Sequence, residues 1–336
     1  MPSEFVFPPR LNLALQPTPL DFLSRLSAEL GLRIWCKRDD LTGGVLTGNK
    51  IRKLEYVLAD ALACGADTLL TCGGLQSNHC RATALLAAKE GLNCELILRG
   101  EPGLHDHDAN LLLSELAGAT IHTYPAAVYQ PQLFELAREH RARLEAEGKT
   151  PYWIATGASD GVGVWGYIRA ARELANDCLS QGITAPLVVC AAGSGGTLAG
   201  LAVGLARYLP RARVLAIAVC DDATYFEGRV GADIAACQQR WPDAGVQMPD
   251  NFQVCDDYIG PGYGEAGAEI YQLISQLARQ EGLVLDQVYT AKAFYGMLQE
   301  LRLGRIDSKD CIFVHTGGVF GLFAAREHFY HPNNFN

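Results

Sequence analysis

"DTLLTCGGLQSNHCRATALLAAKEGLNCELILRG", residues 67–100, contains two short apolar runs on either side of an alanine- and leucine-rich segment. The runs, 67–74 and 94–100, are continuous rather than alternating, as is typical of strands buried on both faces of a parallel sheet. The segment between them, 78–92, has the length and composition of a helix. Strand, helix and strand in this order form a βαβ unit, so the stretch predicts an α/β fold.

The same alternation of short apolar runs and helix-like segments continues along the chain. Further strands are predicted at 119–125, 152–156, 186–193, 214–220, 282–290 and 311–318, and further helices at 107–118, 130–148, 163–182 and 196–209. Glycines follow the helices where a left-handed cap is expected, at Gly65, Gly91, Gly118, Gly148 and Gly182. The Gly- and Ser-rich stretch 155–166 predicts a boundary between two sheet units, with a ligand bound between them at the carboxyl ends of the strands.

The composition excludes several classes of function. The 336 residues carry a net charge of −9 and no long basic block, which argues against a nucleic-acid partner. Charges and glycines interrupt every apolar segment, and the first residues do not resemble a signal peptide, so we expect no membrane span and a cytoplasmic location. Eleven cysteines at scattered positions, several inside strand-like runs, indicate buried reduced thiols rather than a disulfide framework.

The loop "AAGSGGTLAG", residues 191–200, joins a predicted strand to a predicted helix. Its backbone N–H groups and the positive end of the helix can bind an anion. The loop lacks the lysine of a P-loop, and it is not the glycine pattern of a dinucleotide site, so a single phosphate group fits it best. A tight turn without a ligand remains the alternative.

A second loop, "CGGLQSNHCRATA", residues 72–84, places Ser77, Asn78 and His79 at the start of a helix. Ser or Asn at this position is often only the helix cap, but three polar groups after a double glycine favour a binding loop. Cys72 and Cys80 with His79 do not have the spacing of a zinc site, so no metal is expected.

Lys50 lies where the glycine-rich stretch "GGVLTGNKIRKLEY", residues 43–56, becomes a helix. A solvated charge is one interpretation, but the start of a helix is already positive and disfavours an ammonium group. The same field, together with Lys53 one turn later, lowers the pKa of the amine. A neutral amine can form a Schiff base, and next to a single-phosphate loop this suggests pyridoxal 5′-phosphate as the cofactor.

These motifs resemble the D-cysteine desulfhydrase and 1-aminocyclopropane-1-carboxylate deaminase family, a tryptophan-synthase-β-like group of fold type II pyridoxal-phosphate enzymes. The resemblance is carried by "GNKIRKLE" and "GGLQSNHCRATA" and runs from "PTPL", 17–20, to "HTGGVFGLF", 315–323. It implies two domains, each a mainly parallel twisted sheet flanked by helices, with the cofactor in the cleft between them. We expect residues 1–49 and 160–336 to form the larger domain, and 50–159 the smaller one, carrying Lys50 and the QSNH loop.

The resemblance also implies roles for single residues. Lys50 would bind the cofactor as a Schiff base, Asn78 would contact the ring hydroxyl, and Ser77 would contact the substrate carboxylate or assist proton transfer. The phosphate would be held by Lys53 and by the loop residues Gly193, Ser194, Gly195, Gly196 and Thr197. Tyr263 in "GPGYGEAG" and Tyr289 in "LDQVY" would face the substrate, each either transferring protons or only holding it.

Thr290 follows Tyr289 where cyclopropane deaminases carry a glutamate facing the pyridine nitrogen. A neutral hydroxyl leaves that nitrogen unprotonated and the cofactor a weaker electron sink, which favours β-elimination over ring opening. Thr316 is the alternative residue for this position. The leading hypothesis is therefore a lyase that converts D-cysteine to pyruvate, sulfide and ammonia, acting as a homodimer on a small amino-acid substrate.

Three alternatives stay open at this point. The chain could be a cyclopropane-carboxylate deaminase, or a sulfonate lyase or β-replacement enzyme on the same scaffold. It could also be a non-catalytic binding protein for pyridoxal phosphate or amino acids, which the intact Lys50, Ser77, Tyr263 and Tyr289 oppose. Other polar clusters are interpreted as structural, namely His105, Asp106 and His107 in a loop, Asp39 and Asp40 in ion pairs, and His315 either near the cofactor or in the core.

Overall fold

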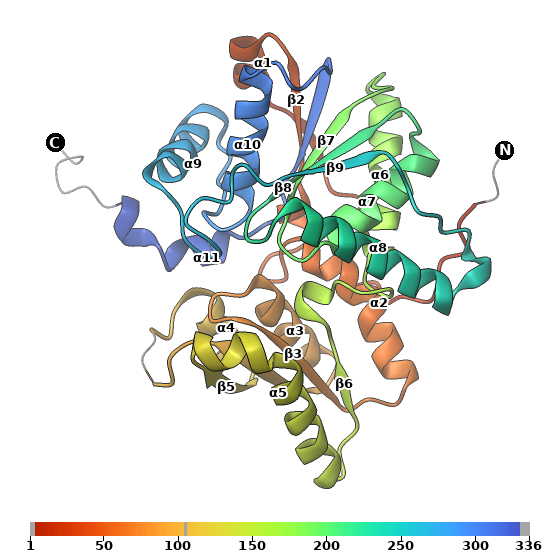
Figure 1. The fold of residues 1–336 in the computed structure, drawn as a ribbon, viewed down its shortest axis with the longest axis vertical. Coiled ribbons are helices and arrows are strands. Elements are labelled where there is room, and N and C mark those ends of the chain that lie inside the picture. Colours follow the sequence, from red (N-terminus) through yellow and green to blue (C-terminus); the bar gives the residue numbers. More distant parts are fainter. Residues whose placement is uncertain (1–3, 104–105, 330–336) are drawn as a thin grey trace.

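The computed structural model describes residues 4–103 and 106–329, which form two sheets with helices on both faces of each (Figure 1). The larger sheet has the order β1-β2-β10-β7-β8-β9, and only the β1–β2 pair is antiparallel. Its strands are β1 (Leu20–Phe22), β2 (Arg33–Lys37), β7 (Leu187–Ala192), β8 (Arg213–Ala218), β9 (Phe252–Cys255) and β10 (Asp310–Val314). The prediction of mainly parallel sheets flanked by helices is confirmed.

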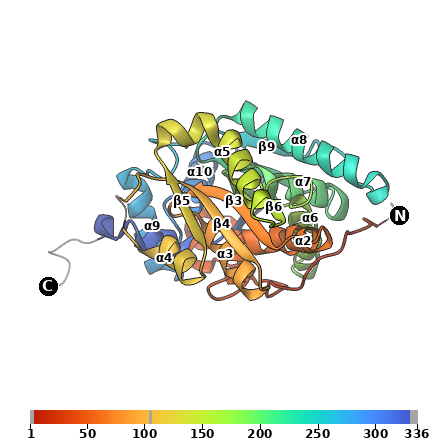
Figure 2. The same ribbon diagram turned by 90° about the horizontal axis from the view of Figure 1, so that it is seen from below.

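The smaller sheet is fully parallel, with the order β5-β4-β3-β6. Its strands are β3 (Thr68–Gly74), β4 (Asn93–Arg99), β5 (Thr120–Tyr124) and β6 (Pro151–Trp153). Helix α5 (Ala126–Ala146) covers one face, and α3 (Asn78–Lys89) and α4 (Ala109–Leu116) lie on the other (Figure 2). The βαβ unit predicted from residues 67–100 is thus β3, α3 and β4, the centre of this sheet.

Two groups of helices cover the larger sheet. On one face lie α1 (Ser24–Leu30), α9 (Ala268–Glu281) and α10 (Thr290–Arg302), and on the other α6 (Val164–Ser180), α7 (Gly196–Tyr208) and α8 (Ala223–Arg240). The short helix α11 (Val319–Phe323) contacts α4 of the smaller sheet. Helix α2 (Asn49–Ala63) packs against both α6 and α3, so it connects the helices of the two sheets.

The strands β3 to β8 and β10 and the helices α3 to α7 lie close to where the sequence predicts them, whereas β1, β2 and β9 were not predicted. The five glycines predicted as caps all have a positive φ, between 68° and 78°. The strand predicted at 282–290 is wrong: this segment is irregular before α10 begins. The carboxylate of Asp286 accepts hydrogen bonds from the N–H groups of residues 288–290, and these donors are therefore lost to a sheet.

The sheet strands of the chain divide by sequence into three blocks. Strands of the larger sheet come from residues 20–37 and 187–314, and those of the smaller sheet from 68–153. The domain boundaries expected at 49/50 and 159/160 stay a prediction, because α2 bridges the two halves. Among the described residues, no helix has the length and apolar character needed to cross a membrane.

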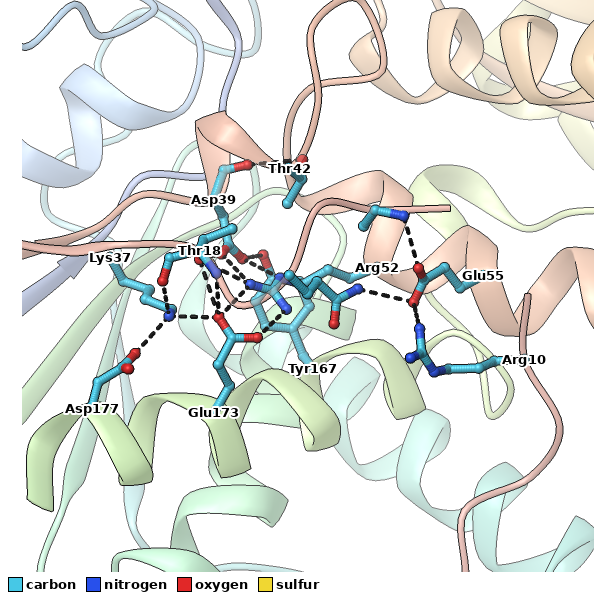
Figure 3. Close-up of polar contacts among 12 residues, drawn as sticks. Arg10, Thr18, Lys37, Asp39, Thr42, Arg52, Glu55, Tyr167, Glu173 and Asp177 are labelled. Atoms are coloured by element: carbon cyan, nitrogen blue, oxygen red, sulfur yellow. Dashed lines mark hydrogen bonds and ion pairs between the residues drawn. The ribbon is translucent and has the colours of Figure 1, made fainter. Parts of the chain in front are cut away.

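A buried network of charges fixes the orientation of α2 (Figure 3). Arg52, 1% exposed, donates hydrogen bonds to both carboxylate oxygens of Asp39, at 2.7 and 2.9 Å, and to both of Glu173, at 2.9 and 3.0 Å. Lys37 adds an ion pair with Glu173 at 2.6 Å, and Tyr167 donates to Asp39 at 2.6 Å. The segment 37–39, α2 and α6 are therefore held together two residues from Lys50.

Candidate active site

The loops that follow strands of both sheets meet at the start of α2. Gly157, which follows β6, leaves so little space that a Cβ there would lie 2.5 Å from Oγ of Ser194 and 3.7 Å from Cε of Lys50. Gly48, with φ at 99°, packs in the same way against the carbonyl oxygen of Thr316, which follows β10. Chain segments that are distant in sequence thus converge on Lys50.

Lys50 itself is a partly buried amine beside an aromatic ring. Its Nζ lies 6.0 Å from the centroid of the Tyr289 ring, and no hydrogen bond or ion pair of this atom is found within the described ranges. Burial, and next the charge of Lys53, lower the pKa of Lys50 well below its ordinary value, against the opposing effect of Asp286. An amine of low pKa without a partner is suited to form a Schiff base.

Lys53 lies one turn further along α2 and points into the glycine-rich loop. Its Nζ donates to the carbonyl of Gly157 and to Oγ of Ser159, both at 3.1 Å, and no carboxylate of the described residues pairs with it. Burial lowers the pKa of Lys53 to about 8. The charges of Asp233 and Asp160 act on Lys53 without direct contact, and its direct partners are neutral oxygens, so an anion beside it would stabilise the ammonium.

The loop from Gly193 to Thr197 has the geometry of a phosphate cradle. Gly195, with φ at 89°, precedes the first residue of α7, and the N–H of Gly196 points to Oγ of Ser159 at 3.1 Å. A Cβ on Gly196 would lie 3.0 Å from Nζ of Lys53, so only glycine leaves this space open. The hydroxyl groups of Ser194 and Ser159 are hydrogen-bonded at 2.8 Å, and the hydroxyl of Thr197 accepts a hydrogen bond from the side-chain amide of Asn49 at 3.0 Å. A helix start, hydroxyl groups and a lysine together suit a phosphate.

The QSNH loop brings polar groups to the same place. Ser77 caps α3, accepting the N–H of Cys80 at 3.2 Å, so the capping interpretation of this residue is correct and its proton is still available. Asn78 accepts from Arg81 at 3.3 Å. His79 is buried and hydrogen-bonded to Thr71 through Nε2 at 2.8 Å, while its Nδ1 has no partner among the described residues.

Besides the two lysines, a buried arginine lies close to these loops. Arg81 is fully buried, contacts only neutral acceptors such as the carbonyl of Thr47 at 2.7 Å, and has its pKa lowered to about 10 by burial. Burial, followed by the charges of Lys50 and Lys53, likewise lowers the pKa of His79, which is therefore neutral. Such a site favours a ligand with several negative charges.

The two tyrosines predicted to face the substrate contact each other. Their hydroxyl groups are hydrogen-bonded, and the ring centroids are 5.8 Å apart at 73°. The guanidinium of Arg99, at the end of β4, lies 5.1 Å from the centroid of the Tyr263 ring. Burial raises the pKa of both Tyr263 and Tyr289, so both hydroxyls stay protonated at neutral pH.

Thr290 and Thr316 have different surroundings. The hydroxyl of Thr290 donates to the carboxylate of Asp286 at 2.6 Å and accepts the N–H of the same residue at 2.8 Å. Its only proton is therefore committed to Asp286. The hydroxyl of Thr316 forms no hydrogen bond in the part of the chain that the structure describes, and residue 316 lies beside the loop before Lys50.

A phosphate cradle next to a partner-free lysine is the arrangement that a pyridoxal-phosphate site requires, and the residues present fit this group. Residues 11–317 match the family model described as "Pyridoxal-phosphate dependent enzyme". The chain belongs to this family of pyridoxal-phosphate-dependent enzymes. The prediction of an enzyme that uses this cofactor is thereby confirmed.

Named relatives of this pyridoxal-phosphate enzyme cover almost its whole length. A putative 1-aminocyclopropane-1-carboxylate deaminase of Thermotoga maritima is 42% identical, over 94% of this chain and 98% of the relative. A D-cysteine desulfhydrase of Klebsiella pneumoniae is 41% identical, over 97% of both chains. A solved structure of an ACC deaminase homologue is 36% identical, with a TM-score of 0.85 over 96% of this chain and 95% of that one. The resemblance stated from the motifs is confirmed.

Other polar clusters of this pyridoxal-phosphate enzyme lie away from the site. Glu95, His122 and His140 bring three possible metal ligands together, but the guanidinium of Arg143 already contacts the Glu95 carboxylate. His122 and His140 also contact this carboxylate, so Glu95 has partners within the chain without a metal ion. That the enzyme has no metal site stays a prediction.

The remaining sequence interpretations have mixed outcomes. Asp40 pairs with Arg38 and Asp39 with Arg52, as structural ion pairs. His315 is a buried histidine, hydrogen-bonded to the carbonyl of Val284 at 2.9 Å. His107 contacts Glu115 at 2.6 Å, whereas His105 lies outside the described residues.

Sequence reasoning missed two buried residues of this pyridoxal-phosphate enzyme that organise the site. Ser159 connects Lys53, Ser194 and Gly196, and Asp286 accepts the N–H groups of residues 288–290 where α10 begins. A signal for Asp286 was available, since an aspartate shortly before a helical segment often accepts the N–H groups of the residues that follow it. Ser159 had no such signal, because its partners are 35, 37 and 106 residues away in sequence.

Proposed function

We propose that this enzyme catalyses β-elimination on a small β-substituted amino acid, with D-cysteine as the favoured substrate. D-Cysteine and water would give pyruvate, hydrogen sulfide and ammonia. The observation that carries the proposal is the amine of Lys50, without a polar partner in the described structure, 6.0 Å from the ring centroid of Tyr289. Relatives named D-cysteine desulfhydrase, 40–42% identical, support the choice of substrate.

Bound pyridoxal phosphate would supply the electron sink that makes the Cα proton of the substrate acidic. Lys50 and the phosphate loop, with Lys53 and Ser159, would hold the cofactor. Lys50, with its lowered pKa, would be the base that removes the proton from Cα. Ser77 and Asn78, at the positive start of α3, would bind the substrate carboxylate and the ring hydroxyl respectively.

The tyrosine pair would deliver a proton rather than remove one. Because burial raises the pKa of Tyr263 and Tyr289, their hydroxyls are donors at neutral pH. Two hydrogen-bonded hydroxyls share one proton between them and keep another available for a leaving thiolate. We expect this pair to protonate the departing sulfur.

We propose Thr316, rather than Thr290, as the neutral residue facing the pyridine nitrogen. An unprotonated nitrogen needs a hydrogen-bond donor, and the Thr290 proton is committed to Asp286. The sequence also carries no glutamate at position 290. A weaker electron sink is sufficient to expel a thiolate, which is a good leaving group, but it disfavours opening a cyclopropane ring.

Cyclopropane-carboxylate deamination is the second candidate, because the Thermotoga maritima relative carries that name at 42% identity. A panel of D- and L-amino acids and the cyclopropane acid, assayed for pyruvate, 2-oxobutyrate and sulfide, separates the two. We expect sulfide and pyruvate from D-cysteine. Release of 2-oxobutyrate from the cyclopropane acid at an equal or higher rate would contradict the proposal.

Binding of the cofactor is tested independently of any substrate. The wild-type protein with pyridoxal phosphate should show a visible absorbance band that Lys50→Ala loses, while Lys309→Met, an exposed lysine, keeps it. A wild-type band without turnover of any amino acid would favour a non-catalytic binding protein. We further propose that the protein is cytoplasmic and forms a homodimer. Sedimentation of the cofactor-loaded protein checks the homodimer.

A further inference from the structure

The loop that carries Tyr263 is poorly held by its own backbone. Between the end of β9 at Cys255 and the start of α9 at Ala268, the described structure contains one backbone hydrogen bond within the loop, from Glu265 to Gly262 at 3.4 Å. Glycines at 260, 262 and 264 all have positive φ, between 69° and 140°. Such a segment has many conformations of similar energy unless side chains fix it.

Lys292 supplies the missing bonds. Its Nζ donates to the carbonyl of Ile259 at 2.8 Å and to that of Gly262 at 2.7 Å. The residue is 1% exposed, and no carboxylate forms an ion pair with it among the described residues. Burying an ammonium whose direct partners are carbonyl oxygens is costly, and the carboxylates of Asp286 and Glu265 offset this cost only without direct contact. The contribution of the ammonium group is therefore found in the two hydrogen bonds that it donates to the loop.

The same helix turn also carries the partner of Tyr263. Tyr289 precedes α10 and Lys292 is the third residue of that helix. The region of α10 contacts the loop near Tyr263 through the Tyr289 hydroxyl and, three residues later, through Lys292. Further along the helix, Glu300 accepts a hydrogen bond from Tyr258 at the beginning of the loop, at 2.6 Å. Asp286 fixes the start of α10 by accepting the N–H groups of Tyr289 and Thr290. The contacts of Tyr289 and Lys292 with the loop therefore come from the same rigid part of the chain.

We propose that Lys292 is a positioning residue that holds residues 259–262 so that the Tyr263 hydroxyl stays in contact with Tyr289. This rests on the proposed function, in which the tyrosine pair donates a proton to the leaving group. Lys292 touches neither substrate nor cofactor in this scheme; it acts through Tyr263. Displacing a proton donor by about 1 Å can lower a rate about a hundredfold.

A double-mutant cycle tests this in the holoenzyme. Lys292→Met should lower kcat for D-cysteine at least about tenfold, with the cofactor absorbance band and the melting temperature changed little. Lys292→Arg, which can still donate to both carbonyls, should restore part of the rate. In a Tyr263→Phe background, Lys292→Met should have no further effect, because the group that it positions is gone. Equal losses in both backgrounds would overturn the proposal.

Hydrogen exchange separates this proposal from the proposed function. Amides of residues 256–266 should exchange faster in Lys292→Met than in the wild type or in Lys309→Met, whereas those of α9 should be unchanged. Unchanged loop exchange overturns the positioning role, whatever the activity. Faster loop exchange in an enzyme that turns over no amino acid would instead overturn the proposed function and leave the loop contact standing. Lys292→Gln replaces Lys292→Met in both measurements where the latter does not fold.

Discussion

The ammonium group of Lys53 lies 3.1 Å from the hydroxyl of Ser159, although the two residues are 106 positions apart. Ser159 in turn contacts Ser194 and the N–H of Gly196, the first residue of α7. One hydroxyl therefore joins the charge on α2 to the glycine-rich loop of the larger sheet. The phosphate site that we propose depends on the contact between these two parts of the chain.

The charge of Lys53 makes phosphate binding dependent on pH. Its pKa is lowered to about 8, so the ammonium is charged below pH 8 and loses its proton above it. Affinity for pyridoxine 5′-phosphate, which cannot react with an amine, should fall about tenfold between pH 7.5 and 9.5. Calorimetry in a Lys50→Ala background excludes titration of the other lysine. Retention of the same pH dependence in Lys50→Ala/Lys53→Met would assign it to another group.

The two threonines should behave differently when their hydroxyls are removed. Thr316→Val should shift the absorbance maximum of the bound cofactor and lower kcat, because a donor to the ring nitrogen is lost. Thr290→Val should lower the free energy of unfolding by about 1–2 kcal/mol, through loss of its bonds to Asp286, and leave the maximum unchanged. Spectra and urea titrations of both variants check this. The opposite assignment of the two effects would place Thr290 at the ring.

The buried network around Arg52 should contribute strongly to stability. Arg52→Met leaves the carboxylates of Asp39 and Glu173 without their main partner, which should lower the free energy of unfolding by about 3–5 kcal/mol. Arg138→Ala removes an exposed pair with Glu135 and should leave the free energy of unfolding nearly unchanged. Urea unfolding measures both. Similar losses in the two variants would show that burial of the network does not matter.

Glu173 should make the protein sensitive to acid. Burial alone would raise the pKa of this carboxyl, but Arg52 and Lys37 outweigh it and lower the pKa to about 2. Its stabilising effect is therefore complete above the unfolded value near 4.5 and is lost as the pH falls toward 2. Unfolding free energies from pH 6 to 3 should decline less steeply in Glu173→Gln. An unchanged slope would mean that other carboxylates dominate acid unfolding.

Local pattern was sufficient for much of the fold. The βαβ unit at 67–100 is predictable because an apolar run, a helix and a second run are each recognisable within a few residues. The same holds for the loop 193–197, where glycines after a buried strand indicate a backbone that approaches a ligand. For the segment 282–290 the local pattern gave a wrong prediction, because the carboxylate of Asp286 accepts the backbone N–H groups that a strand would donate to its neighbour.

The sequence by itself determined the βαβ units of the parallel sheets, the loops after their strands and the position of Lys50 at the start of a helix. These features depend on residues that are close in the chain, so local hydrophobic patterns and helix-end signals are sufficient to predict them. Only the tertiary structure decided that Ser159 joins Lys53 to the glycine-rich loop, that the Thr290 proton belongs to Asp286, and that Lys292 supports the loop of Tyr263. Apart from the Thr290–Asp286 bond, these contacts join residues 30 to 106 positions apart. Packing of distant elements, rather than any local pattern, brings their atoms within hydrogen-bond distance.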